Sequence, residues 1–266
     1  MKMTIAIFLS VFGFSLMAGD VAFGVVPQQS PSVLIKKWKP VTDYLSQKTG
    51  LNVTLSIEKS IPAFEKKLND GVYDVAYVNP YHYVVARKEQ GYDARVRAKK
   101  MIVGILVSTK NRELDSMDFG KMRFLFPSPL AFAATILPKY EIKEKYGVDV
   151  DKDCDLKYVN SHDSVYKGVA RGVGDIGGGI ERTFNNLKDK ETKDKLKIIY
   201  KTRPYPSHPI VFHPRLDKKE AALLREAVLS LPNELLKDLS IKTLIETNDG
   251  EYDVIRKLSK NLKARE

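Results

Sequence analysis

The feature that most constrains the fold of this chain is a regular alternation of strand-like and helix-like stretches from residue 21 onward. Short apolar runs, such as 21–26 and 73–78, are each followed by a polar turn and then by apolar residues at helical spacing. Repeated strand–helix–strand units require a mainly parallel sheet with helices on its faces. The sequence therefore predicts an α/β protein.

The alternation falls into two units along the chain. The second unit begins after the apolar run 101–107, and its predicted strands are 122–126, 156–159, 175–180 and 196–200. A segment with three prolines, Pro204, Pro206 and Pro209, follows that unit and fits neither a helix interior nor a central strand. With 266 residues the chain is long enough for two modest domains.

The first 20 residues predict an export signal. Lys2 precedes an apolar run over 5–17, and the small residues Ala18 and Gly19 follow it, which is the pattern of a secretory signal peptide. The run is short for a membrane-spanning helix. No cysteine lies directly after the run, so we expect a periplasmic protein that is not a lipoprotein. An uncleaved anchor and a buried amino-terminal helix are the alternatives.

The chain is basic, with 44 Lys+Arg against 33 Asp+Glu and a net charge of +11. Such a charge is compatible with nucleic acid, an anionic membrane or a small anionic ligand. Export disfavours nucleic acid, and the lysines are spread along the chain rather than gathered in one run. We therefore expect a solvated basic surface and no nucleic-acid partner.

The sequence carries little that indicates catalysis. The four histidines show no metal-binding spacing, and one cysteine, Cys154, cannot form an internal disulfide. The aspartates around Cys154 should raise its pKa and suppress the thiolate. An enzyme would need Cys154, His162 and Glu181 to converge, so we predict a protein without enzymatic activity, metal or cofactor. The triple glycine 177–179 indicates close backbone approach rather than a nucleotide loop.

Polar turns follow several predicted strands and lead into helix starts. They contain Gln28 and Gln29, Asn79, Ser128, and Ser161 with His162. Ligands of open parallel sheets bind beyond the carboxyl ends of strands, where helix amino termini present N–H groups to an anion. Each turn alone reads as a helix N-cap, but their recurrence at equivalent places predicts a ligand cleft.

The stretches FGVVPQQSP, YDVAYVNPYHYV, FPSPLAFAATILPKY, YVNSHDSVYKGVARGVGDIGGG and PYPSHPIVFHP resemble the phosphate, phosphite and phosphonate binding proteins of ABC importers. The resemblance runs in order through the mature chain. It implies a two-lobed periplasmic-binding-protein type II fold joined by two hinge strands. Lobe 1 would comprise 21–107 and 205–266, and lobe 2 would comprise 108–204.

The resemblance also implies ligand contacts. Ser128 matches the helix start that grips phosphonate oxygens, although the other hydroxyls of that grip are missing here. His162 matches a ligand-contacting histidine, Glu181 matches an acid that pairs with a ligand amine, and His208 stands where amine binders carry an aspartate. The full set of predicted ligand-binding residues is Gln29, Tyr77, Asn79, Tyr81, Ser128, Ser161, His162, Glu181 and His208.

These observations predict a solute-binding protein that captures a small anionic ligand, phosphonate-, phosphite- or phosphate-like, between two lobes. Its partners would be an ABC permease and the ATPase of that permease, and it would meet the membrane only through the permease or an uncleaved signal. Two alternatives keep the scaffold: a periplasmic sensor that feeds a signalling receptor, and a binder of a zwitterionic or non-phosphorus molecule.

Overall fold

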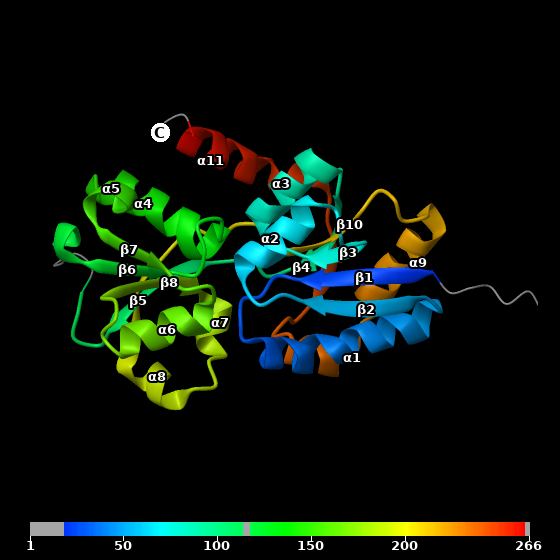
Figure 1. Cartoon of the computed structure of the whole chain (residues 1–266), viewed down its shortest axis with the longest axis horizontal. Coiled ribbons are helices and arrows are strands. Elements are labelled where there is room, and N and C mark those ends of the chain that lie inside the picture. The colour runs from blue at the N-terminus through cyan, green and yellow to red at the C-terminus, as the bar shows by residue number, and fades with distance from the viewer. Residues whose placement is uncertain (1–18, 114–117, 264–266) are drawn as a thin grey trace, which may run out of the picture.

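A computed structural model describes residues 19–113 and 118–263, with side chains to residue 259, and contains two sheets that lie side by side (Figure 1). The predicted signal peptide falls almost wholly outside these residues. The first sheet is formed by β1 (Asp20–Val25), β2 (Asn52–Ile57), β3 (Val75–Tyr77), β4 (Asp93–Ala98), β10 (Pro209–Phe212) and β11 (Leu244–Glu246). The second is formed by β5 (Gly104–Thr109), β6 (Arg123–Phe126), β7 (Asp155–Tyr158), β8 (Ile176–Ile180) and β9 (Leu196–Lys201). The two halves are called lobe 1 and lobe 2 below.

Both sheets are mixed rather than mainly parallel. The strand orders are β11-β4-β10-β3-β1-β2 and β7-β6-β8-β5-β9. In lobe 1, β1 runs parallel to β2 and β3, whereas β10 runs antiparallel to β3 and β4. In lobe 2, β6 runs parallel to β7 and β8, whereas β5 is antiparallel to β8 and β9. The antiparallel strands β5 and β10 each directly follow a crossing between the lobes, so they enter their sheets from the other lobe.

Helices cover both faces of each sheet (Figure 1). Lobe 1 has α1 (Pro31–Thr49), α9 (Lys218–Leu229) and α10 (Asn233–Asp238) on one face, and α2 (Ile61–Asn69), α3 (Pro80–Gln90) and α11 (Asp253–Lys263) on the other. Lobe 2 has α6 (His162–Ala170), α7 (Glu181–Asn185) and α8 (Lys190–Lys195) on one side. Its other side carries the π-helical turn η3 (Phe132–Ile136), α4 (Leu137–Tyr146) and α5 (Val150–Asp153).

The helix starts form as their polar residues predict. The side chains of Ser60, Asn79 and Ser161 each accept a hydrogen bond from a backbone N–H in the first turn of α2, α3 and α6. Gly91 ends α3 in the left-handed region at φ 74°, a conformation that only glycine adopts without strain. These caps fix where α3 and α6 begin, and both helices begin at the junction between the lobes.

The chain crosses between the sheets twice, and the two crossings pair with each other. Ile102 N donates to Tyr205 O at 2.8 Å, and Tyr205 N donates to Ile102 O at 3.0 Å. The proline-rich segment predicted as a linker therefore forms one of the two crossings. The expected lobe boundary at residue 107 falls inside β5, whose residues from Gly104 onward already pair within the second sheet. The sheets thus divide the chain a few residues earlier.

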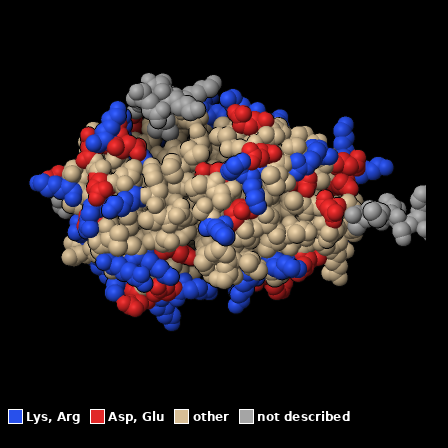
Figure 2. Space-filling view, viewed as in Figure 1, with Lys and Arg blue, Asp and Glu red and all other residues tan. Residues whose placement is uncertain are grey.

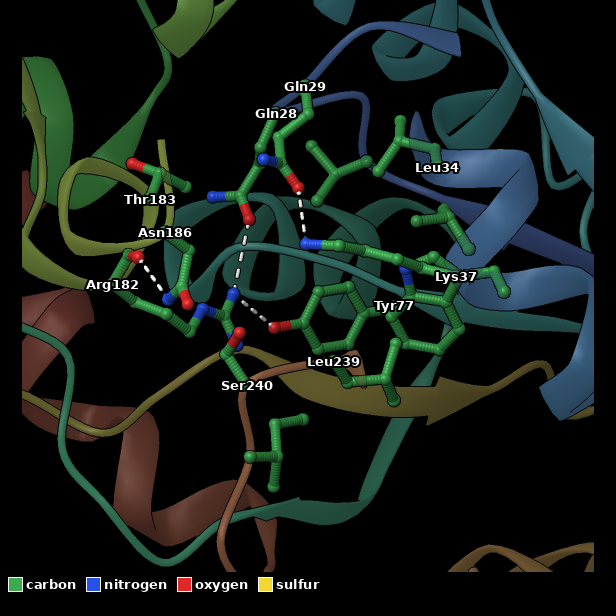
Figure 3. A pocket seen from close by; sticks show the side chains of 14 residues that line it. Gln28, Gln29, Leu34, Lys37, Tyr77, Arg182, Thr183, Asn186, Leu239 and Ser240 are labelled. Carbon is green, nitrogen blue, oxygen red and sulfur yellow. Dashed lines mark hydrogen bonds between the residues drawn. The ribbon is translucent and has the colours of Figure 1, made fainter. Parts of the chain in front are cut away.

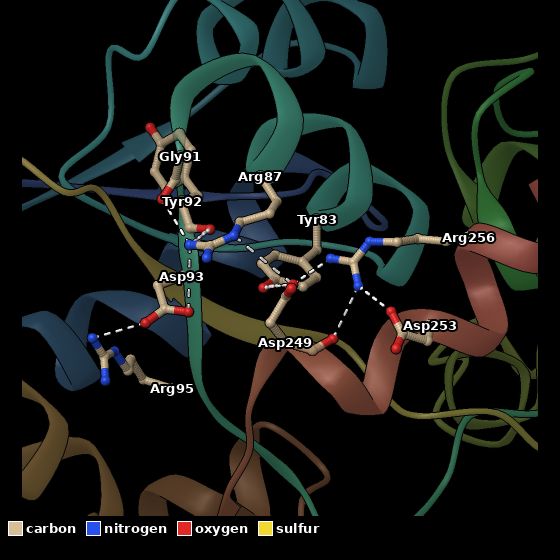
Figure 4. Close-up of polar contacts among 9 residues, drawn as sticks. All are labelled: Tyr83, Arg87, Gly91, Tyr92, Asp93, Arg95, Asp249, Asp253 and Arg256. Carbon is tan, nitrogen blue, oxygen red and sulfur yellow. Dashed lines mark hydrogen bonds and ion pairs between the residues drawn. The ribbon is translucent and has the colours of Figure 1, made fainter.

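Strand β4 was not among the predicted elements, although Ala94, Val96 and Ala98 alternate with polar residues as strand residues do. Ion pairs and hydrogen bonds near it attach the carboxyl-terminal part of the chain to lobe 1 (Figure 4). Asp249 accepts from Tyr83 Oη at 2.5 Å and also pairs with Arg256 on α11. This cluster holds α11 and the segment before it against α3 of lobe 1.

Charged side chains of both signs are intermixed over the outer surface, and no single basic patch dominates the face seen in Figure 2. This distribution agrees with the expectation of a solvated surface. Among the described residues, no helix has both the length and the apolar character needed to cross a membrane.

The glycine-rich strand β8 lets the start of η3 lie directly on the second sheet. A Cβ added at Gly178 would stand 2.0 Å from Ala134 O, and one at Gly104 on β5 would stand 2.0 Å from Ala133 O. Both contacts are far below van der Waals distance. The close approach predicted for 177–179 is therefore made with one helical carbonyl, Ala134 O, and with side chains of α6 and of neighbouring strands.

We predict that Gly178→Ala lowers the free energy of unfolding by about 2 kcal/mol or more, because the new methyl group meets rigid backbone. Urea denaturation measures the change. Gly120→Ala is the matched control, since its nearest neighbours would lie at an ordinary 3.7 Å. Equal stability of the two variants would contradict the role assigned to Gly178.

Candidate functional site

A small buried cavity lies where the two lobes meet, and its volume is about 10 Å³. Lobe 1 contributes Gln28, Asn79 and His208 to its wall, and lobe 2 contributes His162 and the start of η3. Three of the nine predicted ligand residues, Asn79, His162 and His208, are thus brought together from distant parts of the sequence.

Asn79 has two structural roles at this cavity. Its Oδ1 accepts from His82 N at 2.8 Å and so caps α3. Its Nδ2 donates to Leu130 O of lobe 2 at 3.1 Å. The same side chain therefore fixes a helix start and ties the two lobes together.

The two histidines of the cavity are neutral at neutral pH. Burial and the nearby Arg182 lower the pKa of His162 to about 3, and burial also lowers the pKa of His208 well below its usual value. His162 Nδ1 lies 3.0 Å from Thr183 Oγ1. Gln28 Nε2 donates to His208 Nε2 at 2.9 Å, so the proton of the neutral His208 ring resides on Nδ1. The cavity therefore offers hydrogen bonds without a side-chain cation.

The continuous helical segment from Phe132 to Tyr146 points its start at the cavity. The first-turn amides of a helix lack intrahelical acceptors, and here they belong to 132–134. Pro129 has no N–H, and Leu130 N already donates to Ser128 Oγ at 3.3 Å. The amides of 132–134 are therefore the donors that this helix start can offer to an anion.

Ser128 itself is engaged in another contact across the lobes. Its Oγ donates to Glu65 Oε1 of α2 at 3.2 Å, and the same carboxylate oxygen lies 2.8 Å from His82 Nε2. A carboxylate beside this hydroxyl repels an anionic ligand. Ser128 was predicted to bind phosphonate oxygens, but in this conformation it forms a contact between the lobes instead.

Glu181 lies in an adjoining hollow of about 170 Å³ near the two crossings, which shares His208, Ile102 and Ile180 with the cavity. Its carboxylate pairs with Lys201 at 2.7 Å and with Lys100 at 3.1 Å. These hydrogen bonds lower the pKa of Glu181. The acid is therefore ionised and already neutralised by two lysines.

The remaining predicted residues lie around the cavity rather than in its wall. Tyr77 stacks on His208 with ring centroids 5.2 Å apart, and Gln29 accepts from Lys37 Nζ at 2.9 Å. Ser161 is a helix cap that accepts from Ser164 N at 3.1 Å. Tyr81 faces an outer hollow beside Pro129 and Leu130.

Sequence reasoning missed Arg182 and Glu65, and it placed Gln28 in a polar turn of the predicted cleft without including it among the ligand-binding residues. Gln28 is the most connected, because its backbone oxygen accepts from His162 N at 3.1 Å and its Oε1 accepts from Arg182 at 3.3 Å. Arg182 also donates to Tyr77 Oη at 2.7 Å. Gln28 shares a turn with the predicted Gln29, and Arg182 follows Glu181, but only the fold shows where they point.

The convergence that an enzyme would require does not occur. Cys154 packs with the core cluster of lobe 2, and burial and the neighbouring aspartates raise its pKa to about 11. His162 instead contacts Thr183, and Glu181 contacts lysines. Among the described residues, no group of three or more histidine, cysteine or acidic side chains is placed to hold a metal ion.

Two α/β lobes, joined by paired crossings and closed over a small buried cavity, define the class of two-lobed type II solute-binding proteins. The family model for the periplasmic substrate-binding protein of ABC phosphonate transporters matches residues 23–252. The chain belongs to this family, whose members are substrate-binding components and not enzymes. The predicted family and fold are therefore confirmed.

Solved structures agree on the fold. A binding protein of an ABC phosphonate transporter from Pseudomonas aeruginosa superposes with a TM-score of 0.84 at 19% identity, over 91% of this chain and 86% of that one. PhnD1 from Prochlorococcus marinus, in complex with methylphosphonate, gives a TM-score of 0.84 at 20% identity, over 92% and 98%. The periplasmic VFT2 domain of BvgS from Bordetella pertussis superposes with a TM-score of 0.53 at 17% identity, over 83% of this chain and 92% of that one.

We predict that Asn79→Ser favours the open arrangement of the lobes. Serine still caps α3, but it is too short to reach Leu130 O, and one hydrogen bond between the lobes, worth about 1 kcal/mol, is lost. Small-angle X-ray scattering should show a larger radius of gyration while the melting temperature changes little. An unchanged radius, or a melting temperature as low as that of Asn79→Ala, would contradict this assignment.

Proposed function

We propose that this chain captures a small phosphorus oxyanion between its lobes and delivers it to an ABC permease driven by a partner ATPase. The convergence of the helix start at 132–134, Asn79 and His162 on one buried cavity carries this proposal. Amides at a helix start and neutral polar side chains suit an oxyanion. The P. marinus relative with the same fold holds methylphosphonate.

Capture requires motion of the lobes. A cavity of about 10 Å³ has room for about one water molecule, which is less than a phosphonate group needs. The ligand enters when the contacts of Asn79 and Gln28 across the lobes are broken, with the paired crossings at Ile102 and Tyr205 as the hinge. Bound ligand then stabilises the closed state by its higher affinity for it.

The ligand that fits this site carries no amine. Glu181 is paired with Lys100 and Lys201, and His208 is a buried neutral ring, so neither offers a free negative charge to an ammonium group. Ile102 and Ile180, which lie between the cavity and the larger hollow, suit a short alkyl group instead. Methylphosphonate carries such a group, and phosphite and phosphate likewise carry no amine.

The proposal places the protein in the periplasm, exported by its first 20 residues without a lipid anchor. The apolar run behind Lys2 supports export, and the family is periplasmic. The predicted lobes were 21–107 with 205–266 and 108–204. We propose the same two lobes with the first boundary near residue 103, because β5 belongs to the second sheet.

A thermal-shift screen tests the ligand class. Methylphosphonate, phosphite or phosphate at a hundredfold excess over its Kd should stabilise the protein by about 2.7 kcal/mol, and 2-aminoethylphosphonate should stabilise it far less. His162→Leu should abolish the effect, whereas Ser161→Ala, a neighbouring change outside the cavity wall, should keep it. The proposal fails if no phosphorus oxyanion stabilises the protein, or if the aminophosphonate is preferred.

A further inference from the structure

A second group of polar side chains lies at the seam between the lobes, outside the cavity described above. It lines a pocket of about 30 Å³ to which both lobes contribute (Figure 3). Lys37 on α1 of lobe 1 and Arg182 on α7 of lobe 2 approach each other there from opposite sides. Both side chains are only half-buried, so an ion from solvent can reach them.

The two cations have only neutral hydrogen-bond partners. Lys37 Nζ donates to Gln29 Oε1 at 2.9 Å, and Arg182 donates to Tyr77 Oη at 2.7 Å and Gln28 Oε1 at 3.3 Å. Within the residues that the structure describes, neither forms an ion pair with a carboxylate. Lys100, which lines the neighbouring hollow, differs in that it pairs with the carboxylate of Glu181.

The surrounding charges leave the pocket positive. Burial, Arg182 and Lys188 lower the pKa of Lys37, in that order, and they outweigh the opposing effect of Asp163 and Asp238. The positive charges at the pocket therefore repel each other more than the nearby acids attract them. A bound anion would relieve this repulsion and accept charge-assisted hydrogen bonds.

We propose that Lys37 and Arg182 form a second anion site, which takes a small inorganic oxyanion and holds the lobes closed. Half-buried Asn186 and Ser240 supply further polar groups on the wall. Because Lys37 belongs to lobe 1 and Arg182 to lobe 2, the anion bridges them only when the lobes are closed, so it favours closure. Gln28 contacts both Arg182 and His208 and thereby connects this site to the cavity.

Sulfate is the probe for this site, and Trp38 is the reporter. Trp38 is the one tryptophan of the chain and lines the pocket next to Tyr77, with ring centroids 4.8 Å apart. Sulfate is titrated at constant ionic strength into protein saturated with methylphosphonate, so that the cavity is occupied. We expect a saturable change in fluorescence with a Kd that rises roughly tenfold in Lys37→Gln.

Two further variants test whether sulfate binding depends on the charge at position 37 or only on the net charge of the protein. Lys37→Arg should retain sulfate binding, and so should Lys36→Gln, which removes the same charge from an exposed neighbouring position on α1. By reciprocity, sulfate should also raise the affinity for methylphosphonate in the wild type but not in Lys37→Gln. The absence of saturable sulfate binding, or equal sulfate affinity in Lys37→Gln and Lys36→Gln, would overturn the second site.

Only the effect on capture rests on the proposed function. If methylphosphonate does not bind the wild type, the sulfate titration is carried out without it. A response that still depends on Lys37 would then support the second anion site, although the proposed phosphorus-oxyanion function would be contradicted.

Discussion

The hydrogen bonds of Gln28 connect the parts of this structure that matter for function. Its backbone oxygen accepts from His162 N of lobe 2, its amide nitrogen donates to His208, and its amide oxygen accepts from Arg182. One residue thus contributes to lobe closure, to the cavity and to the pocket that contains Lys37 and Arg182, which is called the seam pocket below. Because these contacts join the two lobes, ligand entry must break some of them, which couples binding to the hinge.

Charge is distributed unevenly between the two sites. The cavity holds neutral histidines and a helix start, so its attraction for an oxyanion comes from oriented hydrogen-bond donors. The seam pocket holds Lys37 and Arg182 with neutral partners. The cavity would therefore recognise an anion through oriented hydrogen-bond donors, and the seam pocket would recognise it through the positive charges of Lys37 and Arg182. Charged side chains of both signs are intermixed on the outer face seen in Figure 2.

The sequence predicted the fold in most of its elements, because caps and breakers are local signals. Asn79 and Ser161 cap the helices that they were expected to cap. Strand β4 was missed because a short run of alternating residues between a glycine and a basic segment is a weak signal. The direction of β5 and β10 could not be read from the sequence either, since it depends on where the chain crosses between the lobes.

The candidate site was predictable only in part. Polar turns at strand ends led to Asn79 and His162, which line the cavity, but the same rule led to Ser161, which is only a cap. Arg182 and Glu65 could not be found in this way, because their roles arise from contacts with the opposite lobe. Long-range contacts of this kind leave no spacing pattern in a single sequence.

A crystal structure of the protein with methylphosphonate would show which residues hold the ligand. We expect phosphonate oxygens within hydrogen-bond distance of the amides of 132–134 and of His162 and Asn79, with the Gln28–His208 contact displaced to make room. A ligand seated on Ser128, or held by Glu181 in the hollow beside the crossings, would contradict this expectation.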